Sequence, residues 1–274
     1  MASHSDDAVL LSISDEIATI TLNRPDRMNA LDQSMIAGLA NALDQVEGDL
    51  AHIGAVIIEG SGGTFMAGGD VKFFHQLSQT PPDKARPEIE NMIAKVHDII
   101  ARITALPRPV IAKLDGAVAG FGISLMNACD LAVAAEDTVF TLAYIHIGTS
   151  PDGGSTHSLP RLVGMKKAKE IALLGDRFGA DEAMDCGLIN RVVPHVQLAS
   201  ATAQYATRLA NGPRDAIDRT KALLNDALEH DLSSQLTREA KSFSDCAQSN
   251  DFREGVTAFV EKRSPHFGKS SDKS

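Results

Sequence analysis

Two short glycine-containing segments carry the residues of this chain that are best suited to chemistry. They are residues 65–74, FMAGGDVKFF, and residues 116–130, GAVAGFGISLMNACD. Each follows an apolar β-branched run and precedes a helix-like pattern, which predicts a strand, a glycine turn and a helix start. Glycine lets a ligand approach the backbone, and the first N–H groups of a helix have no partner within it. Two such helix starts that converge would form a two-amide pocket for a developing oxyanion, which predicts chemistry at a carbonyl group.

Composition narrows the class of protein. The 274 residues are 43% hydrophobic and 23% charged, as in an ordinary globular protein. The net charge of −10 disfavours a nucleic-acid partner, and the apolar runs are too short to span a membrane. The N-terminus has no basic stretch followed by an apolar one, and the three cysteines (Cys129, Cys186 and Cys246) form no disulfide framework. We therefore expect a cytoplasmic protein.

Strand-like and helix-like patterns alternate along most of the chain, which predicts an α/β fold. We expect a hairpin over 8–22, a helix after Asn29, a Pro-rich loop over 78–88 and a helix over 88–105. Further strands are expected at 54–59, 110–114, 131–142 and 188–193. The pattern after about residue 195 is helical. The predicted division is a core over 1–198, a helical region over 199–267 and a disordered tail over 268–274.

The order and spacing of several longer segments resemble the enoyl-CoA hydratase/isomerase (crotonase) family over nearly the whole chain. Besides the two glycine segments, these are ITLNRPDRMNAL at 20–31, SPDGGSTHSLPRLVGMKKAKEIALLG at 150–175, ADEAMDCGLINRVVP at 180–194 and REGVTAFVEKRSPHF at 253–267. The resemblance implies a crotonase-like spiral of ββα units with C-terminal helices that form a homotrimer, often a dimer of trimers. It also implies an acyl-CoA thioester as substrate, with coenzyme A as part of the substrate and no permanently bound cofactor.

The resemblance further implies roles for single residues. Gly69 and Phe121 would supply the two oxyanion amides; Phe121 replaces the commoner glycine but keeps the N–H. The positions that would contact coenzyme A are Arg27, Met28, Ala67, Asp70 and Lys72 from the same subunit, and Phe259 and Lys262 from a neighbouring one. Lys72 and Lys262 could instead be solvated charges. His146 and His157 lack the spacing of a metal site, and no metal is expected.

The catalytic carboxylates separate the branches of this family. The two glutamates of the hydratases correspond to Ser124 and Tyr144, which are poor bases near neutral pH. Asp152 occupies the position of the catalytic carboxylate in 3-enoyl-CoA to 2-enoyl-CoA isomerases and in ring-epoxide isomerases. One base and two amides suffice for a double-bond shift, so an isomerase is the leading interpretation, with Ser124 and Tyr144 as auxiliary candidates.

Other interpretations stay open. His97 matches a histidine of 4-chlorobenzoyl-CoA dehalogenases, so a hydratase or another crotonase reaction could use Asp152 with His97. The dehalogenases place a tryptophan where this chain has Tyr144, and this chain has no tryptophan. A catalytically silent acyl-CoA-binding protein is the third alternative. On sequence alone, Asp152 before two glycines is also a typical turn residue, and His97 a structural residue of its helix.

Overall fold

The computed structural model describes residues 7–268, and a six-stranded sheet of order β1-β2-β3-β4-β6-β9 forms its centre. β1 (Val9–Ser14) and β2 (Ile17–Leu22) pair antiparallel, as predicted for the opening hairpin. The φ angles of Asp15 and Glu16 are 51° and 64°, as tight hairpin turns require. The other strands run parallel to β2; they are β3 (Ala55–Gly60), β4 (Val110–Leu114), β6 (Leu131–Ala135) and β9 (Arg191–Val193).

A second, three-stranded sheet receives the continuation of two of these strands. β5 (Ala117–Ala119) follows β4 directly, and β7 (Val139–Thr141) follows β6; the two pair in parallel, and β8 (Phe178–Gly179) completes the sheet. The predicted single strand over 131–142 is therefore wrong, because a turn at Glu136 and Asp137 passes the chain from one sheet to the other. β5 leads at once into α4 (Phe121–Ala128), so β4, β5 and α4 form one ββα unit.

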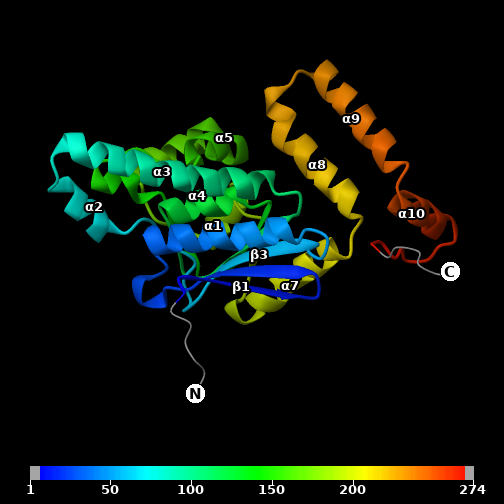
Figure 1. Cartoon of the computed structure of the whole chain (residues 1–274), viewed down its shortest axis with the longest axis horizontal. Helices are drawn as coiled ribbons and strands as arrows, with labels where there is room; N and C mark the ends of the chain where they lie inside the picture. Colours follow the sequence, from blue (N-terminus) through cyan, green and yellow to red (C-terminus); the bar gives the residue numbers. More distant parts are fainter. Residues whose placement is uncertain (1–6, 269–274) are drawn as a thin grey trace.

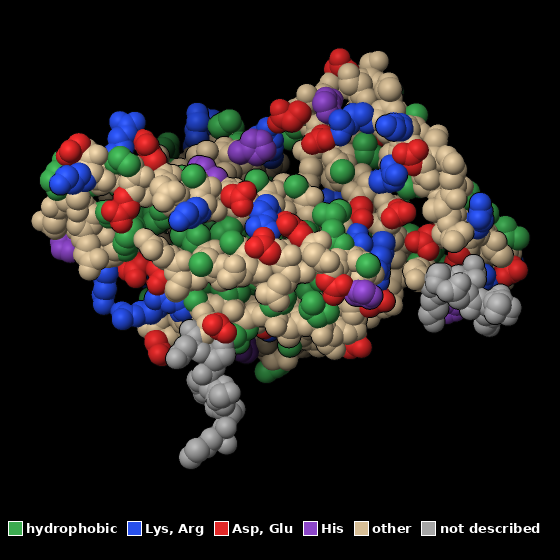
Figure 2. All heavy atoms as spheres, in the orientation of Figure 1, with side chains coloured by type: hydrophobic (Ala, Val, Ile, Leu, Met, Phe, Trp, Pro, Cys, Tyr) green, Lys and Arg blue, Asp and Glu red, His purple; other side chains and the backbone are tan. Residues whose placement is uncertain are grey.

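The two faces of the large sheet have separate cores. Side chains alternate along each strand, so in β3 Val56 and Ile58 join one buried cluster while Ala55 and Ile57 join the other. α1 (Gln33–Gly48), α3 (Pro82–Ala105) and α4 cover one face of the sheet and α7 (Leu198–Ala210) covers the other (Figure 1). The first cluster includes residues of α1, α3 and α4, and the second includes residues of α7. Acidic and basic side chains are interspersed over the face that carries α1 and α3 (Figure 2).

Part of the predicted Pro-rich loop over 78–88 is helical. α2 (Val71–Ser78) ends where the loop was expected to begin, but α3 already starts at Pro82. Pro82 occupies the first helical position, where a missing N–H removes no hydrogen bond, so proline favours a helix start there. The remaining helices of the core are α5 (Ser155–Leu174), which bends at Gly164, and α6 (Ala180–Asp185). None of the helices within residues 7–268 is long and apolar enough to cross a membrane.

Three C-terminal helices stand to one side of this core (Figure 1). They are α8 (Arg214–Asp226), α9 (Leu232–Cys246) and α10 (Asn250–Val260), of whose side chains only that of Ala258 is buried. The predicted boundary after residue 198 falls at the start of α7, yet α7 packs on the sheet, so the separate helices begin at α8. The division into domains stays a prediction. Residues 269–274 of the predicted tail lie outside the described residues, and the N–H of Gly268 donates to Asp251.

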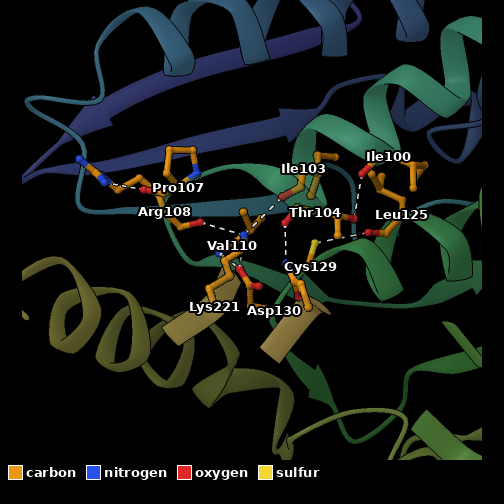
Figure 3. A network of polar contacts seen from close by, with 11 residues as sticks. Ile100, Ile103, Thr104, Pro107, Arg108, Val110, Leu125, Cys129, Asp130 and Lys221 are labelled. Atoms are coloured by element: carbon orange, nitrogen blue, oxygen red, sulfur yellow. Dashed lines mark hydrogen bonds and ion pairs between the residues drawn. The ribbon is translucent and has the colours of Figure 1, made fainter. Parts of the chain in front are cut away.

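Polar contacts attach α8 to the core (Figure 3). The ammonium of Lys221 lies 2.7 Å from the carboxylate of Asp130 and donates to the carbonyl of Arg108. The same carboxylate accepts the N–H of Val110, and the guanidinium of Arg108 pairs with Asp218 at 2.5 Å. Burial raises the pKa of Asp130, an effect that the neighbouring Lys221 opposes. Ion pairs and hydrogen bonds therefore hold α8 against the core.

Candidate active site

The two glycine turns are brought together by one short piece of parallel pairing. Met66 and Val118 form an isolated parallel bridge with backbone hydrogen bonds of 3.0 and 2.8 Å. Gly69 and Phe121 each come three residues after a member of this pair. Because the two segments run in the same direction and in register, both turns arrive at the same end of the second sheet.

The amides of Gly69 and Phe121 are left free at that point. In a second parallel bridge, Leu31 donates to the carbonyl of Gly68 and accepts from the N–H of Asp70. This pattern turns the N–H of the intervening Gly69 away from Leu31. Phe121 is the first residue of α4, whose N–H has no acceptor within the helix. Within residues 7–268 neither amide has a hydrogen-bond acceptor.

Glycine is needed where the two turns touch. Gly68 and Gly120 have φ angles of +98° and +50°, which other residues rarely adopt. A Cβ atom on Gly120 would lie 3.5 Å from the Cα of Gly68, so the turns are in van der Waals contact. The structure thus places the amides of Gly69 and Phe121 side by side, as a two-amide oxyanion site requires.

A pocket with a volume of about 100 Å³ opens in front of these amides. Its lining is mostly apolar and comes from both turns and from α2, α3 and the 3-10 helix η2 (Ala143–Ile147). The lining residues are Leu31, Ala67, Gly68, Gly69, Val71, Phe74, Met92, Val96, Gly120, Phe121, Ala143, Tyr144, Ile147 and Asp152. Asp152 is the one carboxylate among them, so a single charged base faces the two amides.

Asp152 is tied to both other predicted polar residues of the site. The hydroxyl of Tyr144 donates a short hydrogen bond to Oδ1 of Asp152, and the hydroxyl of Ser124 donates to its backbone carbonyl at 2.9 Å. Gly153 follows with a φ of +61°, and a Cβ there would come within 2.8 Å of Phe121 and Ser124. Because any larger residue at position 153 would clash with Phe121 and Ser124, glycine is required for Asp152 to lie against the start of α4.

Tyr144 is a hydrogen-bond donor at ordinary pH. Burial raises the pKa of its phenol well above the usual range, and the negative charge of Asp152 and the hydrogen bond to it raise it further. Tyr144 therefore remains protonated near neutrality and cannot serve as a base there.

Comparisons with known proteins show the family of this chain. Residues 12–270 match the model of the enoyl-CoA hydratase/isomerase family. This chain belongs to that family. It is 38% identical to a probable enoyl-CoA hydratase from Rhodobacter capsulatus over 93% of this chain and 95% of that protein. It is 35% identical to the 1,2-epoxyphenylacetyl-CoA isomerase of Escherichia coli over 94% of this chain and 97% of that protein.

Solved structures confirm the predicted crotonase-like fold. The crystal structure of an enoyl-CoA hydratase from Polaromonas sp. JS666 superposes with a TM-score of 0.88 at 33% identity. The match covers 94% of this chain and 99% of that one. As a member of the enoyl-CoA hydratase/isomerase family, the protein is an enzyme that acts on acyl-CoA thioesters.

The residues expected on the coenzyme A side lie next to the pocket. Ala67 lines it, and its N–H donates to the carbonyl of Met28 at 3.0 Å. Asp70 caps α2 by accepting the N–H of Lys72 at 2.9 Å. Arg27, Met28 and Lys72 are exposed around this edge, where a ligand that enters the pocket could meet them.

Three predicted residues are not brought to the pocket of this subunit. His97 is exposed on α3 and does not line the pocket, although the preceding residue, Val96, does. Phe259 is 85% exposed at the end of α10, and Lys262 follows it. Because α10 and α2 lie at opposite ends of the molecule (Figure 1), these two residues could reach only the pocket of another subunit.

The sequence interpretation missed Asn29, which supports the entrance of the site. Asn29 is fully buried, and its amide group donates to the carbonyls of Ser61 and Thr64 while its oxygen accepts the N–H of Arg24. These bonds connect the loop before α1 to the loop before the first glycine turn. Asparagine adopts positive φ more readily than most residues, and Asn29 has a φ of 54°. Its residue type was the signal from which a structural role in this loop could have been predicted.

A group of metal-binding residue types lies outside the pocket. Asp115, Asp137 and His195 have ligand atoms within 4.8 Å of one another, and the imidazole of His195 lies 3.2 Å from Asp115. Asp137 and His195 are exposed, and exposed acidic residues often lie this close without a metal. The structure therefore assigns no metal site to these three residues.

Proposed function

We propose that this enzyme is an acyl-CoA double-bond isomerase, which converts 3-enoyl-CoA to 2-enoyl-CoA or performs a related ring isomerisation. The observation that carries the proposal is the lone carboxylate of Asp152 facing two free amides in an apolar pocket. The relative named 1,2-epoxyphenylacetyl-CoA isomerase supports the same reaction class.

The proposed reaction needs one base. Asp152 removes a proton from C2, and the electron pair of that C–H bond delocalises into the thioester carbonyl. The resulting dienolate oxygen accepts hydrogen bonds from the amides of Gly69 and Phe121. The protonated Asp152 then returns the proton at C4, so the double bond moves from C3–C4 to C2–C3. No water is added, and no cofactor is needed beyond the coenzyme A of the substrate.

A hydratase is the main alternative, and the names of several relatives favour it. Hydration needs a group to activate water and a group to protonate the neighbouring carbon. Tyr144 is protonated near neutrality and His97 lies outside the pocket, so neither adds a second base beside Asp152. A dehalogenase would need His97 in the pocket, so its exposed position outside the pocket also disfavours dehalogenation. A silent acyl-CoA-binding protein would have no use for the carboxylate.

The deciding experiment is a panel of 3-enoyl-, 2-enoyl- and aryl-CoA thioesters followed by ultraviolet absorbance and by mass spectrometry. An isomerase produces the absorbance of a conjugated 2-enoyl thioester at unchanged mass, a hydratase adds one water, and a silent protein changes neither the absorbance nor the mass. We expect Asp152→Asn to bind thioester but to isomerise at least ~100-fold more slowly, the scale of losing a general base. Asp98→Asn, an exposed carboxylate on α3, is the matched control and should keep full activity. Near-normal turnover by Asp152→Asn would refute the assignment.

We also propose that the protein is a homotrimer or a dimer of trimers. Leucines that α8, α9 and the turn between them expose to solvent support this, among them Leu224, Leu228, Leu232 and Leu236. Assembly would also let Phe259 and Lys262 reach the coenzyme A of a neighbour. Light scattering should give about three or six times the subunit mass of 29.1 kDa, and a stable mass of one or two subunits would refute this assembly. The three free cysteines support our proposal of a cytoplasmic location.

A further inference from the structure

The two carboxylate oxygens of Asp152 have different surroundings. Oδ1 accepts the short hydrogen bond from the hydroxyl of Tyr144. No group of residues 7–268 bonds to Oδ2. One oxygen is therefore held in place, and the other is available to a substrate in the pocket that both residues line.

Both partners of this hydrogen bond are fixed at their backbones. The carbonyl of Tyr144 accepts the N–H groups of Gly148 and Thr149, which closes the turn after η2. The carbonyl of Asp152 accepts the hydroxyls of Ser124 and Ser155 at 2.9 and 3.3 Å. Since neither backbone is free to move away, the hydroxyl and the carboxylate remain within reach of each other.

We propose that Tyr144 is a positioning residue, whose hydroxyl holds Oδ1 of Asp152 so that Oδ2 takes the substrate proton and returns it. This inference rests on the proposed function, because it assigns the proton transfer to one oxygen of the proposed base. An unheld carboxylate could rotate about its Cβ–Cγ bond and present either oxygen in many orientations, which lowers the fraction of productive encounters.

The hydroxyl of Tyr144 remains a hydrogen-bond donor near neutral pH. Burial and the charge of Asp152 raise the pKa of Tyr144, so the phenol stays protonated when the carboxylate is ionised. Ionisation of Tyr144 therefore sets no alkaline limit to activity near neutral pH.

The first test is Tyr144→Phe, which keeps the ring in the pocket wall and removes only the hydroxyl. We expect kcat to fall about tenfold with KM nearly unchanged, the scale of a hydrogen bond to a charged group. The pH at which activity falls on the acid side should move upward, because the ionised carboxylate has lost a donor. A side chain that merely packs would change neither quantity, and unchanged kcat with an unchanged pH profile would overturn the proposal.

Tyr205→Phe is the matched control. Tyr205 is the other tyrosine of the chain and lies on α7, where its ring faces the guanidinium of Arg191 at 5.9 Å. Phenylalanine keeps that ring contact, so the variant should retain wild-type kcat and pH profile.

The second test needs no substrate. The chain has no tryptophan and two tyrosines, so Tyr205→Phe leaves Tyr144 as the one phenol whose ionisation ultraviolet absorbance can follow. Adding Asp152→Asn removes the charge and should lower the pH at which Tyr144 ionises. Identical titrations with and without Asp152→Asn would overturn the contact. If the thioester panel finds no isomerase while the titrations still differ, the proposed function fails and the contact stands.

Discussion

The pocket end and the C-terminal end of this molecule are built on different principles. At the pocket, backbone hydrogen bonds and buried apolar side chains fix two amides and one carboxylate. At the other end, α8, α9 and α10 bury almost nothing, and Leu224, Phe243 and Phe259 are 69–85% exposed. The first region is held by contacts within one chain, whereas the second has an apolar surface suited to a partner. Changes at the two ends should therefore alter different measurements.

The largest expected effect is at the pocket end. Gly69→Pro removes one of the two proposed oxyanion donors outright, and loss of such a donor typically costs about 2.7–4 kcal/mol of transition-state stabilisation. We expect kcat to fall roughly 10²- to 10³-fold while the melting temperature falls by only a few degrees, because the new Cβ must displace the ring of Phe74. The neighbouring hydrogen bond from Asp70 to Leu31 uses a different N–H and can persist. Steady-state kinetics measure kcat, and circular dichroism with melting curves shows whether the variant is folded.

A folded Gly69→Pro variant with normal turnover would show that this amide is not part of the site. An unfolded variant would show instead that the turn itself is required, and Phe121→Pro would then test the second amide, since proline is favoured at a first helical position.

The second effect belongs to the other end. Lys221→Met removes the partner of Asp130, and the side chains of the two residues are only 8% and 23% exposed. Leaving a largely buried carboxylate unpaired should lower the free energy of unfolding by roughly 3 kcal/mol. The kcat of the folded enzyme should stay near normal, because α8 does not line the pocket. Urea denaturation measures the first quantity and steady-state kinetics the second.

Lys241→Met on α9 is the control for this change, because its side chain is exposed and should affect unfolding by less than about 0.5 kcal/mol. If Lys221→Met unfolds like the control, α8 is attached by contacts other than the ion pair of Lys221 with Asp130 in Figure 3. If it loses kcat as well, the two ends are coupled.

A third, smaller effect concerns Met92, which we expect to limit the length of the acyl chain that the pocket accepts. Met92 lines both the pocket and a groove between α1 and α3, whose floor includes Ile36 and Ala40. Met92→Ala should connect the two spaces and admit longer acyl chains, with about 0.8 kcal/mol gained per buried methylene. We expect KM to fall several-fold for the longer thioesters of a series. Met165→Ala, exposed on α5, should leave the series unchanged; an unchanged series for Met92→Ala would mean that the acyl group lies elsewhere.

Local signals made several parts of the fold predictable. The hairpin at Asp15 and Glu16, the helix after Asn29 and the two glycine turns each follow from a few neighbouring residues. The outward position of His97 also follows from periodicity, because Val96, Ile99 and Ile103 form the buried stripe of α3. The sequence interpretation did not use this pattern when it kept His97 as a candidate.

Contacts between distant segments were not predictable from single residues. The register of Met66 with Val118, which brings the two amides together, depends on the pairing of the second sheet. The hydrogen bond from Tyr144 to Asp152 depends on the turn after η2 and on the two glycines after Asp152. Asp152 itself entered as a candidate through family resemblance, since its local sequence describes an ordinary turn equally well.

The smallest expected effect is that of Gly69→Ala, which keeps the N–H that proline removes. Gly69 does not have a positive φ, so alanine is compatible with the backbone, but its Cβ would lie 2.7 Å from Cε2 of Phe74. The ring of Phe74 is the far end of a flexible side chain and can shift, at an overpacking cost of about 1 kcal/mol. We expect kcat within about fivefold of wild type and a change mainly in KM, because Phe74 lines the pocket. Combining Gly69→Ala with Phe74→Leu should restore KM by making room for the methyl group. A loss of kcat as large as that of the proline variant, unrelieved by Phe74→Leu, would mean that space at the Cα of Gly69, and not its amide, is what the pocket requires.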